Sequence, residues 1–551
     1  MTAAGGFGRR LREAWYASPI HAWRISGDAP DGLAVALTDP WPGDADAGRE
    51  ILEGAFPVAG QLVHVGADPW RTDGLTDGAA ETLHRFEWLR DLRDLGGDAA
   101  RRRARDLVGG WIEVFDRWDR LAWRSDILSS RLAAWVATFG FFAESADESF
   151  REAVLASLAR QHRHLLGALS GGPDGIARIE ALRGAITAGV ALGHDGDRLQ
   201  ALVDRLDATV RDQIFPDGGH RARSPRAQLT VLAGLVDARA ALRAAGREST
   251  GGLDEAIGRM TGVLRMMRHG DGGLALFNGA TEGTVWRIDS LLARTESKAR
   301  AVTSATDTGF ERLTAGRAVA IMDTGVPTAE ENLVHAGSLS FELSVGKERL
   351  IVNCGAAPAD PRWEAALRAT AAHSALVVDD TNSSEIGSDG ALGRRPTRVR
   401  VERWEADGAV WVEAEHDGYA ETHGVTHRRR LYLAAGGDDL RGEDVLTYAG
   451  GPGARPAEAV IRFHLHPRVA ASVVQNGAAA LLRTASGMGD GGWRLRSAGG
   501  ALQLQDSVYF GDRGTLQRCR QLVLATPAGA VRDDGSLTIK WALRREERRT
   551  A

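Results

Sequence analysis

The stretch that decides the fold of the second half of the chain is His335-Ala-Gly-Ser-Leu-Ser-Phe-Glu-Leu-Ser344. From Leu339 to Val345, apolar side chains alternate with polar ones. Because successive side chains of a β-strand point to opposite faces, this alternation predicts a strand with one apolar face and one face in contact with water. Such a strand can present His335 at its beginning.

Two short segments after this strand carry further polar residues. Leu350-Ile-Val-Asn-Cys-Gly355 has Asn353 at the end of an apolar run, and Ala371-Ala-His-Ser374 places His373 among small residues. Together with the first segment, they set two histidines around a strand-rich core.

Beyond Gly309 the sequence keeps this period of two. Apolar residues at 410, 412 and 414 alternate with Trp411, Glu413 and Glu415, and Gly-Asp and Gly-Gly pairs separate the runs. Many short strands divided by turn residues predict an antiparallel β domain, folded as a large sandwich.

The first half has the period of a helix instead. Apolar residues recur at intervals of three and four from about Thr82 to Asp254, as in Leu132, Trp135, Val136 and Phe139. Breaks such as Gly171-Gly-Pro-Asp-Gly175 separate these rows. Successive amphipathic helices in series predict a toroid or a solenoid, and their spacing leaves both open.

These patterns divide the chain into three predicted parts. Residues 1–75, which include Asp39-Pro-Trp-Pro-Gly43, are expected to form an irregular arm laid against the helical body. Residues 76–305 form the predicted all-α domain and residues 306–551 the β domain, with a Ser- and Thr-rich junction at about 294–308. The predicted fold class is multidomain α+β.

The composition excludes several functional classes. The chain has 551 residues and a formal charge of −5, with acidic and basic residues interspersed, so no overall field favours nucleic acid. The two cysteines, Cys354 and Cys519, match no metal or redox spacing and exclude a disulfide scaffold. Residues 1–25 lack the apolar run of a signal peptide, and no window approaches a transmembrane span. The expected location is therefore the cytoplasm, and the oligomeric state is not indicated.

Several motifs occur in an order typical of one family. They are His84-Arg-Phe-Glu-Trp-Leu-Arg-Asp91, Ile214-Phe-Pro-Asp-Gly-Gly-His220, the segments from His335 to Ser374 quoted above, Arg368-Ala-Thr370 and Glu415-His-Asp-Gly-Tyr419. In order and spacing the chain resembles the heparinase II/III-like family of polysaccharide lyases, related to heparinases and oligoalginate lyases. The resemblance implies an α/α toroid followed by a β-sandwich, with an acidic polysaccharide in the cleft between them. It also implies the periplasm or cell envelope as the alternative location.

The resemblance implies a metal site as well. Zinc-binding relatives gather two histidines and an acidic residue, and the matching positions here are His335, His373 and Asn353. A neutral amide oxygen is a weak zinc ligand, so zinc is a candidate cofactor with an incomplete ligand set. His464 and His466, two residues apart in a predicted strand, form a second candidate pair.

The activity implied by the resemblance is β-elimination of a uronic-acid glycoside, a carbon–oxygen lyase reaction. The sugar carboxylate must be neutralised, a base must take the C5 proton, and an acid must protonate the leaving oxygen. Relatives supply a tyrosine in a Ser-Pro-X-Tyr-His run, which here is Ser224-Pro-Arg-Ala-Gln228. Ala227 and Gln228 thus replace the Tyr and His, and none of the five tyrosines lies between residues 17 and 418.

Seven residues remain as candidates for the reaction. Those expected in catalysis are His220, Tyr419 and His335, and those expected to bind substrate are Arg223, Trp88, Arg368 and His416. A histidine titrates near neutral pH, and an arginine can hold a carboxylate through two hydrogen bonds. We expect His220 and Arg223 to act from the helical side of the cleft, and Tyr419 and His335 from the β side.

Tryptophans crowd the first predicted helices, at Trp88, Trp111, Trp118, Trp123 and Trp135. At helical spacing an indole serves either as a core residue or as a stacking platform for a sugar ring. The sequence leaves both roles open.

A polysaccharide lyase is the leading interpretation, and two other functions stay open. Ala227, Gln228 and Asn353, with the absence of tyrosine from the predicted helices, favour a glycan-binding or envelope-associated protein that has lost catalysis on the same scaffold. A helical solenoid that serves only protein contacts would instead leave the candidate residues scattered.

Overall fold

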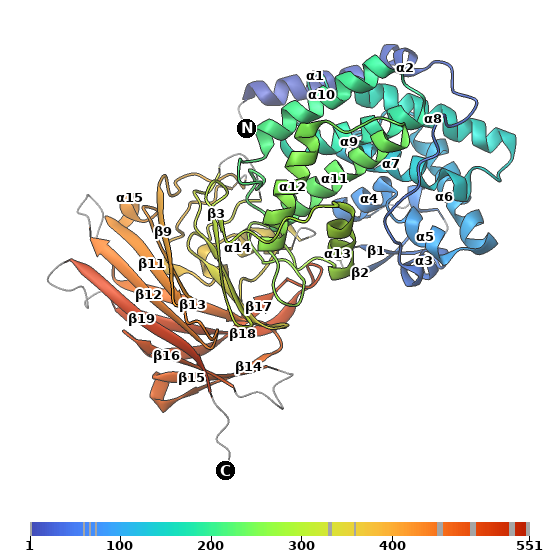
Figure 1. The fold of residues 1–551 in the computed structure, drawn as a ribbon. Coiled ribbons are helices and arrows are strands. Elements are labelled where there is room, and N and C mark those ends of the chain that lie inside the picture. The colour runs from blue at the N-terminus through green and yellow to red at the C-terminus, as the bar shows by residue number, and fades with distance from the viewer. Residues whose placement is uncertain are drawn as a thin grey trace. The chain divides into compact units, whose positions relative to one another are not determined.

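The computed structural model describes residues 3–58, 61–65, 68–71, 74–328, 333–357, 360–388, 390–448, 456–484, 492–527 and 535–546. The chain separates into two compact units, which we call the helical unit (Met1–Gln213 with Thr230–Ile257) and the β-rich unit (Ile214–Leu229 with Gly258–Ala551). Figure 1 shows helices in the first half of the chain and strands in the second, as the two hydrophobic periods predict.

The helical unit is built from amphipathic helices in series. They are α1 (Ala3–Tyr16), α2 (Pro19–Ile25), α3 (Ala45–Leu52), α4 (Asp77–Arg85), α5 (Leu89–Leu95), α6 (Gly97–Phe115), α7 (Ser125–Phe142), α8 (Glu148–Ala168), α9 (Gly175–Ala191) and α10 (Gly196–Gln213). The helices α11 (Pro225–Ala244) and α12 (Gly251–Met266) each contribute residues to both units.

Two of these helices, α7 and α9, are buried along most of their length. They approach each other closely at Gly184. A Cβ atom at this position would lie 2.6 Å from the Cα of Ser129, so only glycine fits without moving the backbone. The close approach explains why α9 needs a glycine in its interior, although glycine has a low helix propensity.

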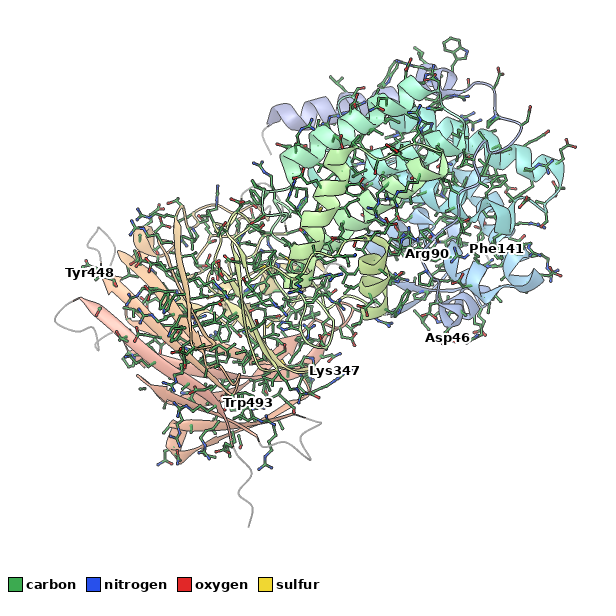
Figure 2. All side chains as sticks on the ribbon, in the orientation of Figure 1. Asp46, Arg90, Phe141, Lys347, Tyr448 and Trp493 are labelled. Atoms are coloured by element: carbon green, nitrogen blue, oxygen red, sulfur yellow. The ribbon has the colours of Figure 1, made fainter. Side chains whose placement is uncertain are left out.

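The predicted irregular arm contains several regular elements. Besides α1, α2 and α3, residues 1–75 form the antiparallel pair β1 (Ala55–Val58) and β2 (Gln61–His64) and the short 3₁₀ helix η1 (Pro69–Arg71). Residues 39–43 lie outside the helices and strands. Asp39 accepts a hydrogen bond from Nε of Arg90 (3.0 Å), which anchors this part of the chain to α5. Arg90 is labelled in Figure 2 among the side chains of the helical unit.

The β-rich unit contains two antiparallel sheets. Its strands are β3 (Ser304–Ala305), β4 (Phe310–Ala315), β5 (Ala318–Asp323), β6 (Phe341–Val345), β7 (Glu348–Val352), β8 (Leu376–Val378), β9 (Val399–Ala406), β10 (Ala409–His416), β11 (Val425–Leu433), β12 (Asp439–Tyr448), β13 (Glu458–Leu465), β14 (Val469–Val474), β15 (Ala479–Thr484), β16 (Trp493–Ala498), β17 (Leu502–Tyr509), β18 (Gln517–Pro527) and β19 (Ser536–Arg545). The unit also contains the short helices α13 (Val285–Arg294), which precedes the strands, and α14 (Pro361–Leu367), η2 (Thr370–Ala372), α15 (Ala420–His423) and η3 (Gln475–Gly477), which lie between them.

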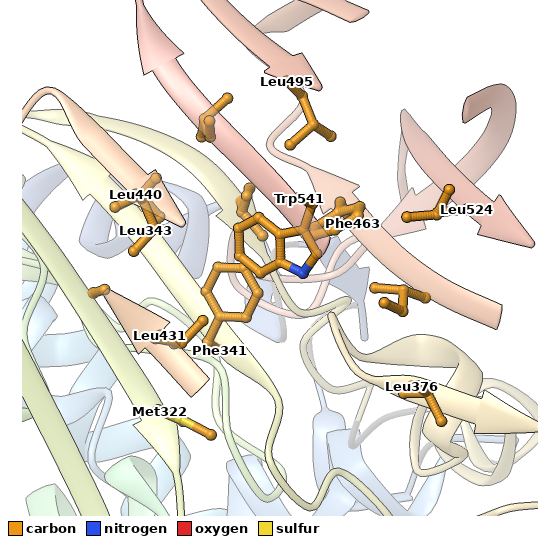
Figure 3. Close-up of a cluster of buried hydrophobic side chains, with 14 of the residues drawn as sticks. Met322, Phe341, Leu343, Leu376, Leu431, Leu440, Phe463, Leu495, Leu524 and Trp541 are labelled. Carbon is orange, nitrogen blue, oxygen red and sulfur yellow. The ribbon is translucent and has the colours of Figure 1, made fainter. Parts of the chain in front are cut away.

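One sheet has the strand order β14-β15-β16-β19-β12-β11-β10-β9, and the other has β17-β18-β13-β7-β6-β5-β4-β3, with β8 paired to β13. Apolar side chains from both sheets meet in one core, which makes this unit a sandwich. At its centre Phe341 stacks on Trp541, with ring centroids 5.4 Å apart and planes at 11° (Figure 3).

The alternation predicted for 410–415 is confirmed in β10, whose apolar side chains are buried while Trp411, Glu413 and Glu415 are partly exposed. The alternation of the first quoted stretch has a different outcome. The strand β6 exists, but its polar face is not in contact with water, because Glu342 and Ser344 are fully buried.

The segment that covers this polar face begins at His269. Its ring nitrogens lie 2.9 Å from Oε2 of Glu342 and 2.8 Å from Oγ of Ser344, and the backbone N–H of Leu276 donates to the same carboxylate (3.1 Å). The prediction that this strand face contacts water was therefore wrong. Buried polar side chains need hydrogen-bond partners, and here a segment distant in sequence supplies them, which the local alternation does not indicate.

Candidate functional site

The loop between α10 and α11 carries two of the predicted residues and belongs to the β-rich unit. Asp217 fastens it, since its two carboxylate oxygens accept hydrogen bonds from the hydroxyl (2.6 Å) and the backbone N–H (2.7 Å) of Thr308. Gly218 has φ +95°, and a Cβ there would lie 2.5 Å from the carbonyl carbon of Arg259. The Asp-Gly-Gly sequence is therefore needed to build this loop.

Arg223 lies at the end of this loop with a positive φ of 52° and a buried side chain. Its Nε donates to the carbonyl of Thr308 (2.6 Å), and its Nη2 donates to the carbonyl of Gly309 (3.2 Å) and pairs with Asp323. Burial raises the pKa of Asp323, and the charge of Arg223 opposes that rise. Most of the guanidinium is thus used inside the protein, which leaves Nη1 without a partner among the described residues.

His220 is buried as well. Its Nδ1 accepts a hydrogen bond from the backbone N–H of Ala222 (3.0 Å), so the proton is on Nε2. This Nε2 is buried and has no hydrogen-bond partner among the described residues. Burial, with a smaller effect of Arg221, lowers the pKa of His220 to about 4. The imidazole is therefore neutral at pH 7.

The positions of the replaced Tyr and His have a structural role. Ala227 is buried, and Gln228 accepts a hydrogen bond from the backbone N–H of His220 (2.9 Å) while its Nε2 donates to the carbonyls of Gly218 (2.9 Å) and Met260 (3.0 Å). Gln228 therefore holds the loop in shape, and it is fully buried.

His335 and His373 meet, as the sequence predicted. Nδ1 of His335 lies 3.1 Å from Nε2 of His373, whose own Nδ1 lies 2.8 Å from the carbonyl of Ala369. The second bond makes His373 Nδ1 a donor, so His335 donates to His373. Burial lowers the pKa of both histidines, that of His373 to about 4.

Asn353 lies nearby but is oriented for a different purpose. Its Oδ1 accepts a hydrogen bond from the backbone N–H of Ser374 (2.9 Å), and its backbone N–H donates to Glu342 (2.7 Å). Among the described residues no three His, Cys, Asp or Glu side chains form a group that could hold a metal ion. Because a catalytic zinc needs three protein ligands, the donors present do not fit that metal.

The second candidate pair, His464 and His466, does not come together in one site. His464 is buried in β13, with its ring nitrogens 2.8 Å from Oγ of Ser507 and 2.9 Å from the carbonyl of Ala371. His466 follows the strand and lies 3.5 Å from Glu282. Each imidazole therefore has its own partners.

Tyr419 and His416 lie in the interior of the sandwich. The hydroxyl of Tyr419 donates to the carbonyl of Leu376 (2.8 Å), and complete burial raises the pKa of this phenol. Nδ1 of His416 accepts from the backbone N–H of Gly418 (3.0 Å). Burial and the neighbouring His427 lower the pKa of His416 well below its usual value.

A buried ionic network continues from His416, and sequence analysis did not find it. Nε2 of His416 lies 3.2 Å from Nδ1 of His427, whose Nε2 lies 2.8 Å from Oδ1 of Asp444. Nε of Arg429 donates to the same oxygen (2.7 Å), and its Nη1 reaches the carbonyls of Leu339 and Ser374. The signal was present as three polar residues at inward positions of adjacent strands.

The other two predicted binding residues are also used internally. Arg368 donates from Nε (3.1 Å) and Nη2 (2.9 Å) to the carbonyl of Val334 and so anchors the loop of His335. Trp88, in the helical unit, packs against Phe56 and Phe86 and donates from Nε1 to Leu83 (3.0 Å). The roles assigned to these residues in substrate binding stay predictions.

A cavity of about 780 Å³ lies at the surface of the β-rich unit, and of the predicted site residues Arg223 lines it. Among its lining side chains are four arginines and four threonines, namely Arg221, Arg223, Arg394, Arg395, Thr306, Thr324, Thr328 and Thr397. Two carboxylates, Asp307 and Glu421, also line it, and the described lining contains no tyrosine or histidine. We call it the arginine cavity.

Arg394 is held firmly in the wall of the arginine cavity. Its Nη2 donates to the carbonyl of Asn382 (2.8 Å), and its Nη1 contacts the carbonyls of Gly418 and Ser383. Arg395 next to it is half-buried and makes one long bond, to the carbonyl of Gly393 (3.3 Å). Fixed guanidinium groups among hydroxyls suit an anionic, hydroxyl-rich ligand.

Comparison with known proteins identifies the family. The sequence profile "Heparinase II/III-like, C-terminal" matches residues 297–542. FtsZ-localized protein C of Caulobacter vibrioides is 33% identical over 573 residues, covering 98% of this chain and 94% of that protein. The chain belongs to the heparinase II/III-like family.

Solved structures of family members support the same architecture. Heparinase III matches 93% of this chain and 86% of its own, with a TM-score of 0.71 and 14% identity. The heparan sulfate lyase HepC from Pedobacter heparinus matches 93% and 85%, with a TM-score of 0.62 and 15% identity. At these identities the likeness establishes the fold, a helical toroid followed by a β-sandwich, as predicted. No helix among the described residues is long and apolar enough to cross a membrane.

Proposed function

We propose that this protein binds an acidic saccharide in its arginine cavity without cleaving it. The observation that supports this most is the cavity lining, which combines arginines and threonines with no described phenol or imidazole. A uronic-acid carboxylate pairs with guanidinium groups, and sugar hydroxyls pair with threonine hydroxyls.

The state of the predicted catalytic groups points the same way. Tyr419 donates to Leu376, and His335 donates to His373. A base for β-elimination must reach the proton on C5 of the sugar, either directly, at roughly 2.6–3.2 Å, or through one bridging water. A fully buried phenol with a raised pKa would have to leave its hydrogen bond to do this.

The test compares binding with turnover on one panel of polymers: heparan sulfate, alginate, hyaluronan and polygalacturonate. We expect binding by calorimetry and no ultraviolet absorbance from unsaturated products. Arg395→Gln should weaken binding by about fivefold to tenfold, the value of a partly exposed charge-assisted hydrogen bond. Arg398→Gln is the matched control, since Arg398 is exposed nearby but does not line the cavity.

Release of unsaturated products would contradict the proposal and support the lyase activity that the family resemblance predicted. In that case Glu421→Gln and Tyr419→Phe identify the base, because only substitution of the catalytic base should abolish the release of unsaturated products. Absence of binding to every polymer on the panel would also contradict the proposal.

A second function rests on the relative whose name places it with FtsZ. Because the 33% identity extends over 98% of this chain, we propose that this protein is also recruited to the division apparatus. A fluorescent fusion should then form a band at the division site that disappears on FtsZ depletion. A uniform distribution in dividing cells would contradict this recruitment.

A further inference from the structure

The helical unit contains a cavity of its own, of about 450 Å³. It lies where α7 and α9 begin, and the end of α8 and the last turns of α1 complete its walls. Its volume falls within the range of small-molecule sites, roughly 300–1,000 Å³. We call it the aromatic cavity.

Its walls are built from four rings. The ring of Tyr16 lies edge-on to His164, with centroids 4.7 Å apart, and Trp118 lies 6.1 Å from Tyr16. Trp123 meets His164 at 5.1 Å and 87°. The structure thus separates the clustered tryptophans. The partly exposed Trp118 and the buried Trp123 line the cavity, whereas the buried Trp88, Trp111 and Trp135 do not.

His164 is fixed by a second histidine. Its Nδ1 lies 2.9 Å from Nε2 of His21, and burial lowers the pKa of His164 to about 3. The pair is therefore neutral at pH 7. Because the hydrogen bond between them fixes both rings, this histidine pair forms an uncharged wall of the cavity, which neither repels a cation nor attracts an anion.

The charges at the mouth of the cavity are unequal. Arg120 lies 3.4 Å from Glu13, and Arg124 lies 2.7 Å from Asp126, so these four charges form pairs. The guanidinium of Arg12 has no hydrogen-bond or ion-pair partner among the described residues, and the same holds for the hydroxyl of Tyr16. One cation and one hydroxyl are thus left to meet a ligand.

We propose that the aromatic cavity binds a pyranose ring that carries a carboxylate, the uronic-acid unit of an acidic saccharide. The apolar face of the sugar ring packs on Trp118 and Tyr16, the carboxylate pairs with Arg12, and a sugar hydroxyl bonds the hydroxyl of Tyr16. This site lies in the helical unit and does not depend on the arginine cavity.

The test uses two probes that differ at one carbon, methyl glucuronide and methyl glucoside. Saturation-transfer NMR and calorimetry on the full chain should show binding of the glucuronide and much weaker binding of the neutral glucoside. Arg12→Gln should weaken glucuronide binding about tenfold and leave the glucoside unchanged. Trp118→Ala should weaken both probes, and Trp118→Phe, which keeps a ring, should weaken them less.

Two matched controls lie outside the cavity, one on α1 and one on α2. Arg10→Gln removes an exposed cation of α1, and Trp23→Ala removes an indole of α2 that is 78% exposed. Both should bind like the native chain. Because the arginine cavity could also take a uronic acid, the titrations are repeated in Arg395→Gln, where the Arg12 effect should persist.

Three results would overturn this inference. They are absence of glucuronide binding, equal affinity for the two glycosides, and loss of all binding in Arg395→Gln alone. Circular dichroism of each variant separates a lost site from a lost fold.

Discussion

The two units differ in how accessible their tyrosines are to a ligand. In the β-rich unit, Tyr419 and His416 are fully buried and bonded to their surroundings, although the sequence marked them as site residues. In the helical unit, the sequence assigned no site role to Tyr16, yet its ring lines a cavity and its hydroxyl has no partner among the described residues. The difference teaches that a motif position locates a residue in the fold, whereas burial decides whether a ligand can reach it.

The largest expected effect comes from breaking the network behind His416. Asp444→Ala would leave Arg429 and His427 buried without their carboxylate, which costs about 3–5 kcal/mol in the free energy of unfolding. Denaturant titration measures this loss. Glu443→Ala, the neighbour in β12 whose partner Lys540 is exposed, should cost less than about 1 kcal/mol. Equal losses would show that the network does not stabilise the sandwich.

Next in size is the replacement of Asn353 by the acid found in zinc-binding relatives. Asn353→Asp should cost about 2–3 kcal/mol without metal, because it buries a carboxylate whose oxygen replaces the amide N–H. It also supplies the anionic ligand that His335 and His373 lack, so added zinc should restore the thermal stability.

Elemental analysis completes the zinc experiment. The native chain is expected to retain no stoichiometric zinc after dialysis, whereas Asn353→Asp retains it. Tightly held zinc in the native protein that disappears in His335→Ala would show that the amide suffices as a ligand.

A smaller effect should appear as a pH dependence. The pKa of His220 in the folded protein, about 4, lies below the usual 6.5. Between these two pH values the unfolded chain binds a proton at this residue and the folded chain does not. The stabilisation is therefore complete above pH 6.5 and is lost as the pH falls toward 4. Between pH 7 and pH 5 this single residue contributes a loss of about 2 kcal/mol.

The matched variants for this measurement are His220→Asn and His64→Gln. Asparagine can still accept the hydrogen bond of Ala222 but cannot be protonated, so the loss between pH 7 and pH 5 should shrink. His64 is exposed in β2, and its substitution should leave the loss unchanged. An unchanged pH dependence in His220→Asn would show that other groups dominate it.

The smallest effect compares two tyrosines directly. Tyr419→Phe removes one buried hydrogen bond and should cost about 1 kcal/mol of stability with no change in saccharide binding. Tyr16→Phe should change stability very little, because its hydroxyl has no described partner, but it should weaken glucuronide binding by about threefold. The opposite result for either residue would reverse the comparison between the units.

Much of the fold followed from local patterns. The apolar periods of three to four and of two predicted the helical and β halves because each period reports which face of an element is buried. The motif order from His84 to Tyr419 indicated the family, and the meeting of His335 with His373 followed from it. The regular structure of residues 1–75 was missed, since its short elements carry too few residues to establish a period.

The accessibility of each candidate residue was decided by tertiary structure alone. Nothing near Arg223 in the sequence announces Asp323, which is 100 residues away, and nothing near Glu342 announces His269. A polar side chain pairs with whatever the fold brings within about 3 Å, and that partner comes from a distant segment. The sequence by itself therefore determined which residues carry chemistry and which architecture holds them, whereas the packing of distant segments determined which of them stay open to a ligand.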